Sequence, residues 1–312
     1  MALPVFAEHL ARYGPNRSQP GKFTLAESRE YCKRLAHQHY ENFVVASLLL
    51  PSRLKPHFFS LYAWCRWADD LADETTSPEE SLRLLDWWED ELFALYAGRP
   101  KQIVTLALQE TISAFKIPID PFLDLLVAFR QDQQQTRYET EAQLLDYCRH
   151  SANPVGRLVL YLAGVHDESS IKLSDSICTG LQLANFWQDI ARDWQRGRLY
   201  LPRETLHRHE LKEEEFARGE LTPPIRSLLC DQVANVEEML ESGLALVERI
   251  PQEFRLQIEL FARGGLAILS AIRKQDYDVW SKRPKVGKLT QFKLLTSCWW
   301  HQRRKRQQGP AE

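Results

Sequence analysis

The sequence predicts an all-α protein built as one domain. Glycine is scarce, at 13 of 312 residues, about half of its usual share of about 7%, which disfavours turn-rich β folds and folds with glycine-rich nucleotide loops. No alternating apolar–polar pattern extends beyond four residues, so no half-buried strand is indicated. Hydrophobic residues make up 44% of the chain and charged residues 26%, the mixture of a globular protein with a real core.

The N-terminal segment 1–22 is predicted to be an irregular arm, because it combines three prolines with two glycines. The main domain is predicted over 23–290, followed by a basic tail over 291–312. Its first helix begins at Thr24, which has the capping-box spacing to Glu27, and ends at Leu50 before a proline.

The remaining helices follow from apolar periodicity and from stop signals between them. A helix over 55–72 ends at a Thr-Thr-Ser-Pro turn, whose Ser77 caps the next helix over 78–96, and a Gly-Arg-Pro loop follows. Segment 203–221 is highly charged and is predicted to be a surface excursion of helix and loop. The other predicted helices cover 101–115, 120–133, 140–149, 154–164, 173–195, 223–249 and 252–280.

Composition and processing signals point to a cytoplasmic protein. The six cysteines include no Cys-x-x-Cys pair and no zinc spacing, so reduced thiols are expected. The first residues lack the pattern of a signal peptide, and no window approaches the ~18 apolar residues of a spanning helix. The formal net charge of −2 disfavours a nucleic-acid partner.

The first candidate site is a stripe on the predicted helix over 55–72. Asp69 and Asp73 are four residues apart and share one face. Arg66 and Tyr62 precede them on the same stripe among largely apolar neighbours. Two like charges on a core-facing stripe are unfavourable unless a cation lies between them, and Mg²⁺ suits carboxylate oxygens and substrate phosphates. A solvated acidic helix end is the alternative.

A second stripe lies on the predicted helix over 173–195. Gln182, Asn185, Asp189 and Asp193 follow steps of three, four and four residues. Gln188 adds another carboxamide beside them. Amides on an apolar helix need partners, which a metal–phosphate assembly would supply. Two such stripes in one helical chain are stronger evidence than either alone.

Together, the two stripes resemble the motifs of the squalene/phytoene synthase family of head-to-head isoprenoid synthases. The segment from Tyr147 to Arg157, with Asn153, Pro154 and Gly156, is similar to the middle signature of that family. The stretch from Arg273 to Lys285, with Tyr277, resembles its last core helix. The resemblance covers about residues 25–290 and implies the isoprenoid synthase fold, with helices surrounding a central apolar cavity.

The resemblance also implies roles for individual residues. Asp69, Asp73, Asp189 and Asp193, with Asn185, would hold two or three Mg²⁺ ions that bind and ionise a diphosphate. The same polar end of the cavity would be lined by Tyr62, Arg66, Gln182 and Asn185. Aromatic side chains would face the carbocation, with core filling as the alternative role. The aromatic candidates are Phe43, Tyr147 and Phe186, and the water-positioning candidates are Tyr40, Asn42 and Asn153.

Two departures from the family pattern narrow the expected function. Gln188 stands where the second motif usually has arginine, and the His39–Phe43 segment replaces a serine-rich diphosphate-binding stretch. Fewer phosphate ligands suit an enzyme that handles one diphosphate. These variants resemble the bacterial hydroxysqualene synthase subgroup (HpnC-type) of hopanoid biosynthesis, which implies Mg²⁺-dependent conversion of presqualene diphosphate to hydroxysqualene.

Other functions stay open. Within the family, the alternative is condensation of two farnesyl or geranylgeranyl diphosphates to presqualene diphosphate, squalene or phytoene. Outside it, the alternative is a catalytically silent helical partner in a lipid-synthesis complex, which retention of all four aspartates disfavours. Other squalene-pathway enzymes are candidate partners of the chain. No nicotinamide cofactor is predicted, because no Gly-x-Gly-x-x-Gly motif follows a strand.

The predicted basic tail carries two adjacent tryptophans and four consecutive cations, Arg303 to Arg306. A solvated terminus is one interpretation. The other is peripheral contact with anionic lipid at the inner membrane face. Residues 271–312 hold 11 Lys and Arg against 3 Asp and Glu, so the near-neutral total conceals a basic C-terminal segment.

Overall fold

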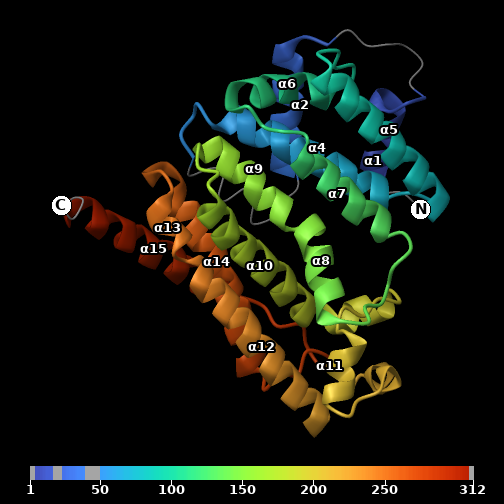
Figure 1. Cartoon of the computed structure of the whole chain (residues 1–312), viewed down its shortest axis with the longest axis vertical. Coiled ribbons are helices and arrows are strands. Elements are labelled where there is room, and N and C mark those ends of the chain that lie inside the picture. The colour runs from blue at the N-terminus through green and yellow to red at the C-terminus, as the bar shows by residue number, and fades with distance from the viewer. Residues whose placement is uncertain (1–3, 17–22, 39–49, 309–312) are drawn as a thin grey trace. The chain divides into compact units, whose positions relative to one another are not determined.

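The computed structural model describes residues 4–16, 23–38 and 50–308, and every regular element within these ranges is helical (Figure 1). This confirms the all-α prediction. The N-terminal helices are α1 (Pro4–Tyr13), α2 (Leu25–Gln38), α4 (Lys55–Asp73), α5 (Pro78–Tyr96), α6 (Ile103–Phe115) and α7 (Asp120–Gln131). The later helices are α8 (Glu141–Ser151), α9 (Asn153–Ala163), α10 (Glu168–Gln195), α11 (Arg203–Arg208), a 3₁₀ turn (Glu213–Arg218), α12 (Pro223–Gly243), α13 (Leu246–Arg249), α14 (Gln252–Lys274) and α15 (Lys288–Gln308).

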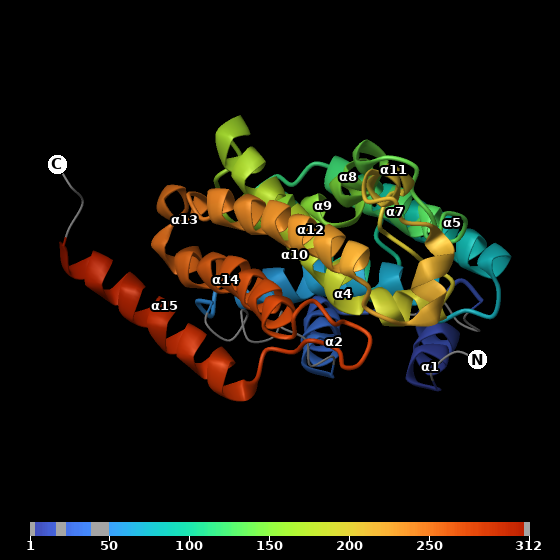
Figure 2. The same ribbon diagram turned by 90° about the horizontal axis from the view of Figure 1, so that it is seen from below.

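The chain divides into two compact units, and α9 contains a boundary between them. The first unit comprises residues 1–135 and 157–164, and the second comprises 136–156 and 165–312. In the first unit, α4 is the central helix and packs against α2, α5, α6 and α7. In the second, α10 packs against α8, α12, α13 and α14, and α15 lies beside α14 (Figure 2).

Tryptophans fill the core of the first unit. The Trp88 ring stacks on Trp64 with centroids 5.9 Å apart and on Trp67 with centroids 5.5 Å apart. All three side chains are buried. Burial of such large rings is a major source of core stability. The high aromatic content of the chain therefore serves packing in this unit.

Several predicted boundaries are confirmed by the hydrogen bonds of helix caps. Thr24 and Glu27 form the predicted capping box, in which the Glu27 amide donates to Thr24 Oγ1 and the Thr24 amide donates to Glu27 Oε2. Ser77 caps α5 by accepting from the Glu80 amide. The predicted first helix continued to Leu50; residues 39–49 lie outside the described part of the chain.

Other predictions about the elements were wrong. Residues 4–13 form a helix rather than an irregular arm, and α1 buries Phe6 and Tyr13. The predicted helix over 252–280 ends at Lys274, because Asp276 and Tyr277 adopt left-handed backbone angles with φ of 56° and 66°. The predicted helix over 223–249 divides into α12 and α13.

The start of α10 differs from the prediction by five residues, because Asp167 rather than a later residue caps it. The Asp167 carboxylate accepts from the Ser170 amide at 3.0 Å and from the Ser170 hydroxyl at 2.6 Å. Arg249 also donates to it, at 3.2 Å. These contacts fix the beginning of the helix that carries the second aspartate stripe.

The Asp167 cap makes folding stability depend on pH. The hydrogen bonds from Ser170 lower the pKa of Asp167 to about 2, below its unfolded value of about 3.9. Its ionised form therefore stabilises the fold above about pH 4, and this contribution disappears as the pH falls towards 2. We expect Asp167→Ala to lower the urea midpoint of unfolding at pH 7. The difference in midpoint between the variant and the wild type should be smaller at pH 3. A difference that stays constant with pH would contradict the charged cap.

Substituting two helical glycines by alanine should change the stability of the protein in opposite directions. At Gly243, a Cβ atom would lie 2.5 Å from Ile177 Cγ1 and 3.1 Å from the Leu173 carbonyl oxygen of α10. At Gly264, a Cβ atom would have no neighbouring atom within 4 Å. We expect Gly243→Ala to destabilise the protein by about 1–3 kcal/mol through overpacking. Gly264→Ala should stabilise it by about 0.5–1 kcal/mol through helix propensity. Urea unfolding of both variants measures the change in the free energy of unfolding. A change of the same sign in both variants would refute the packing argument.

No helix in the described ranges is both long enough and apolar enough to cross a bilayer.

Candidate functional site

The first aspartate stripe lies on α4, within the first compact unit. Its predicted members occupy one helix, with Tyr62 buried, Asp69 half-exposed and Asp73 exposed. The two aspartates thus present carboxylate oxygens to solvent at one helix end, while the preceding turn is embedded in the core. The residues share one helix, as their spacing predicts, and their role in a site stays a prediction.

Arg66 is held by two carboxylates of its own helix. Its guanidinium lies 3.1 Å from Asp69 Oδ2 and 2.5 Å from Asp70 Oδ1. Asp70 was not among the predicted site residues, although its i,i+4 spacing to Arg66 could have identified it. Burial raises the pKa of Asp70 to about 6, against the lowering effect of Arg66. The buried Asp70 thus orients Arg66 towards the more exposed Asp69.

The second stripe lies on α10, within the second unit. Asn185 is exposed, and Gln182, Asp189 and Asp193 are partly exposed, so the predicted stripe reaches solvent along one side of the helix. Burial, together with the negative charge of Asp189, raises the pKa of Asp193 to about 6. Arg196, Arg198 and Arg192 act in the opposite direction, so burial is the main cause of the raised pKa.

Arg283 joins this stripe from a distant part of the sequence. Its Nε and Nη2 atoms donate to the two carboxylate oxygens of Asp189, at 2.5 and 2.6 Å. Nη2 also donates to Gln188 Oε1 at 2.9 Å. The bidentate geometry is the strong form of an arginine–carboxylate contact.

Gln188 is buried and ties the Arg283 segment to α10. Its Nε2 donates to the Pro284 carbonyl oxygen at 2.6 Å, while its oxygen accepts from Arg283. The sequence interpretation that Gln188 simply removes a cation from the site was therefore incomplete. A glutamine can accept from Arg283 and donate to the backbone at once, so the pair places a guanidinium beside Asp189.

An aromatic cluster lies one helical turn from Asp189. The Phe186 ring stacks on Tyr200 with centroids 3.6 Å apart and planes 5° apart. Tyr147, one of the predicted substrate residues, lies 6.2 Å from Phe186 and 6.0 Å from Tyr200. The sequence identified Tyr147 and Phe186 but missed Tyr200, which follows the loop after α10. The π faces of this cluster could stabilise a cation.

Two other predicted residues, Asn153 and Tyr277, have hydrogen-bond partners outside the stripe. Asn153 is buried, and its side-chain oxygen accepts from Thr179 at 2.9 Å. Thr179 lies one turn before Gln182, the first residue of the stripe, and about 15 Å along the helix from Asp189. The hydroxyl of Tyr277 donates to Cys230 Sγ of α12, at 3.4 Å. Three other predicted substrate residues, Tyr40, Asn42 and Phe43, lie outside the described part of the chain.

Gly156 lies in close contact with α10. A Cβ atom there would lie 2.4 Å from Ser174 Oγ and 2.5 Å from Cys178 Sγ, both on α10. The glycine therefore permits close approach of this neighbouring helix.

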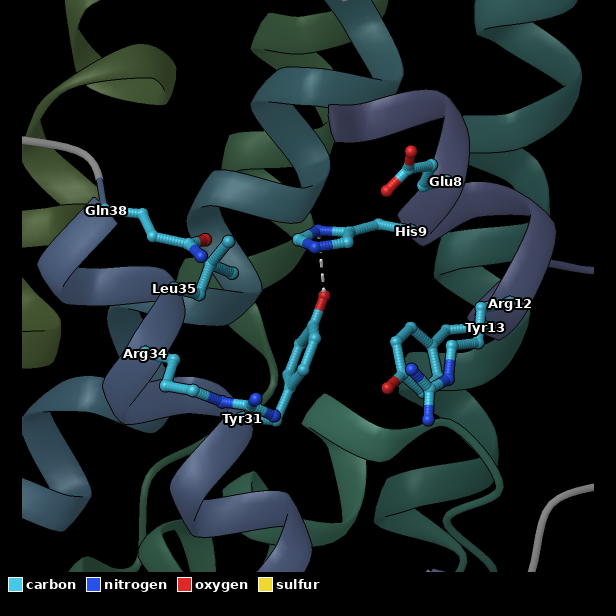
Figure 3. A pocket seen from close by; sticks show the side chains of 8 residues that line it. All are labelled: Glu8, His9, Arg12, Tyr13, Tyr31, Arg34, Leu35 and Gln38. Carbon is cyan, nitrogen blue, oxygen red and sulfur yellow. Dashed lines mark hydrogen bonds between the residues drawn. The ribbon is translucent and has the colours of Figure 1, made fainter. Parts of the chain in front are cut away.

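A small cavity of about 180 Å³ lies between α1 and α2 of the first unit, and its lining includes none of the predicted site residues (Figure 3). His9 points towards the Tyr31 hydroxyl at 3.2 Å, and that hydroxyl accepts from Trp67 Nε1 at 3.0 Å. Arg12 and Arg34 also line the cavity. Its contacts connect α1 to the tryptophan core and supply no group of the two stripes.

The donor chemistry of the stripes fits Mg²⁺. Asp69, Asp73 and Asp193 offer the carboxylate oxygens that this ion prefers. Within the described ranges, no three His, Cys, Asp or Glu side chains converge on one point. Magnesium binding, and which residues share an ion, thus stay predictions.

The model of the squalene/phytoene synthase family matches residues 36–290. "Phytoene synthase 1, chloroplastic" from Zea mays is 30% identical over 85% of this chain, which spans 66% of that relative, slightly under two thirds. "15-cis-phytoene synthase" from Synechococcus elongatus is 27% identical over 87% of this chain and 92% of its own length.

Solved structures show the same fold. The squalene synthase HpnC from Alicyclobacillus acidocaldarius superposes with a TM-score of 0.79 and 41% identity, over 81% of this chain and 96% of that one. A dehydrosqualene synthase in complex with ligand superposes with a TM-score of 0.82 and 24% identity, over 90% and 98% of the two chains. The second likeness concerns fold alone.

Proposed function

Because the chain belongs to the squalene/phytoene synthase family of isoprenoid synthases, we propose that it converts presqualene diphosphate to hydroxysqualene. In this reaction, the C–O bond to the diphosphate breaks, the cyclopropylcarbinyl cation rearranges, and water adds with loss of a proton. The products are hydroxysqualene, diphosphate and H⁺. The family resemblance also leads to a second candidate activity, condensation of two allylic diphosphates.

The higher identity to the HpnC structure carries this proposal. It is 41%, against 27% and 30% for the two phytoene synthases above. The unit formed by Gln188, Arg283 and Asp189 departs from the family motif, because glutamine stands where arginine is usual and a guanidinium from a distant segment lies beside Asp189 instead. This altered phosphate-binding apparatus sets the chain apart from the usual pattern of the family.

Each stripe offers groups suited to ionisation. Arg66 in the first unit and Arg283 in the second each present a guanidinium of the kind that would neutralise a departing diphosphate, which is a poor leaving group until its charge is compensated. Bound at the aspartates, Mg²⁺ would supply Lewis-acid stabilisation of that charge. Tyr147, Phe186 and Tyr200 would present π faces to the cation and exclude nucleophiles.

Condensation of two allylic diphosphates is the second candidate function. The observation that favours it is the similarity to phytoene synthases over 85–87% of the chain. Such an enzyme must bind two diphosphates in the first step. It would therefore consume farnesyl or geranylgeranyl diphosphate with no other isoprenoid present.

Separate incubations of the purified full chain with Mg²⁺ distinguish the two functions. One contains presqualene diphosphate in H₂¹⁸O, and the others contain farnesyl or geranylgeranyl diphosphate. We expect ¹⁸O-labelled hydroxysqualene from the first and no C30 or C40 product from the others. Presqualene diphosphate, squalene or phytoene formed from an allylic diphosphate alone would refute the proposal and support condensation.

A further inference from the structure

The C-terminal helix α15 is fixed to α14 by a buried carboxylate. Gln302 Nε2 and His301 Nδ1 lie 2.5 and 2.9 Å from the Glu259 oxygens, and Arg263 Nε donates to the same carboxylate at 2.8 Å. Burial alone would raise the pKa of Glu259, but the hydrogen bonds outweigh it and the pKa is lowered. Leaving such a charge without partners would be costly. One face of α15, with Cys298 and Gln302 buried, is therefore specifically docked.

The opposite face of α15 exposes large apolar side chains. Leu289 is 69% exposed, Phe292 64%, Trp299 43% and Trp300 55%. Their spacings of three, seven and eight residues place them on one side of the helix. Four of the eight large hydrophobic residues exposed in the described ranges lie on this helix, and the other four are scattered over α2, α5, α7 and α8. We call these four residues of α15 the outer stripe.

α15 carries positive but no negative side chains. Its sequence contains lysines and arginines but no Asp or Glu. The Arg303 guanidinium lies over the Trp299 ring, 4.9 Å from its centroid, and Arg304 is exposed. Lys305 and Arg306 follow in the sequence. Tryptophan beside arginine is the combination that favours the interface of an anionic bilayer, where the ring enters the headgroup region and the cation meets phosphate.

We propose that the outer stripe binds the surface of an anionic lipid bilayer, with α15 lying in the plane of the interface. The docked face keeps the helix attached to the protein, so binding needs no unfolding of α15. A second copy of the chain fits the stripe less well, because two copies of α15 would bring only like charges together. A solvated terminus would not place two tryptophans and a phenylalanine in water on one side.

Vesicle sedimentation with the full chain tests this proposal without reference to turnover. Vesicles of phosphatidylcholine alone are compared with vesicles containing about one third phosphatidylglycerol. We expect binding to the anionic vesicles only, weakened by high salt. Trp299→Ser/Trp300→Ser and Arg303→Gln/Arg304→Gln should each reduce the bound fraction by about tenfold or more.

Matched controls come from exposed residues elsewhere. Phe93 of α5 is 50% exposed, and Phe93→Ser should bind as the wild type does. Arg83→Gln/Lys172→Gln removes two exposed cations away from α15 and should also leave binding unchanged. Thermal unfolding checks that all variants are folded. Absent binding to anionic vesicles, or unchanged binding of the tryptophan variant, would overturn the proposal. Dimerisation that the tryptophan variant abolishes would also overturn it, in favour of a second copy as the occupant.

Discussion

Replacing Asp189 with asparagine should lower turnover by about 10³-fold or more while leaving the fold intact. The substitution keeps the size of the side chain but removes its charge, and with it the bidentate contact with Arg283. Removing a single preorganised electrostatic group from an active site typically costs 10²–10³ in rate. Asp189 is also predicted to hold Mg²⁺, and loss of a metal ligand would add to that cost.

The position of Asp189 explains why the fold should tolerate this change. Its side chain is partly exposed, and its contacts are made to a segment outside the helix packing of α10. Asp69→Asn on α4 should likewise leave the fold intact, because Asp69 is half-exposed. We expect it to lower turnover by a comparable factor. Both measurements use initial rates with presqualene diphosphate and, separately, with farnesyl and geranylgeranyl diphosphate.

A control on the same helix separates loss of chemistry from loss of a surface charge. Glu168 lies in the first turn of α10 and is largely exposed, where it pairs with Lys172. Glu168→Gln should retain the wild-type rate, and far-ultraviolet circular dichroism should be the same for all variants. Wild-type turnover in either aspartate variant would eliminate that aspartate from the reaction.

The two stripes were predictable from the sequence because helical spacing is local information. Asp69 and Asp73, or Asp189 and Asp193, share a helix face once the helix is recognised. The partner of Gln188 was not predictable in this way. Arg283 is 95 residues away in the chain, and only the packing of the segment after α14 brings it to α10.

The ends of the helices were also not predictable from local spacing alone. Apolar periodicity continues past Lys274, yet α14 stops there because Asp276 and Tyr277 turn left-handed, which spacing does not report. The N-terminal helix α1 was hidden by a proline at its first position and by the glycines and prolines that follow it. Its burial of Phe6 depends on a tertiary contact with Trp67. Asn153 matched a motif, but Thr179 occupies its side-chain oxygen. Local pattern thus identified the residue types, and tertiary packing decided which of them meet.

Arg283→Gln tests whether the guanidinium beside Asp189 performs the role of the arginine that the family motif usually places at position 188. We expect turnover to fall by roughly 10²-fold, because a cation that would face the departing diphosphate is lost. The concentration of Mg²⁺ needed for half-maximal rate should decrease, because Asp189 no longer pairs with a guanidinium. The neighbouring Lys282 is exposed, and Lys282→Gln should change neither quantity.

The double variant Gln188→Arg/Arg283→Gln gives the sharper result, since it moves the cation from one position to the other. If the reaction requires the guanidinium, the double variant should turn over at least tenfold faster than Arg283→Gln, because the relocated guanidinium again stabilises charge. Non-additivity of this kind measures the coupling of two residues in contact. A double variant no faster than Arg283→Gln would show that the Gln188 contact to the Pro284 carbonyl matters in its own right, because Gln188→Arg also removes that hydrogen bond. Wild-type turnover in Arg283→Gln itself would exclude any role of this guanidinium in the reaction.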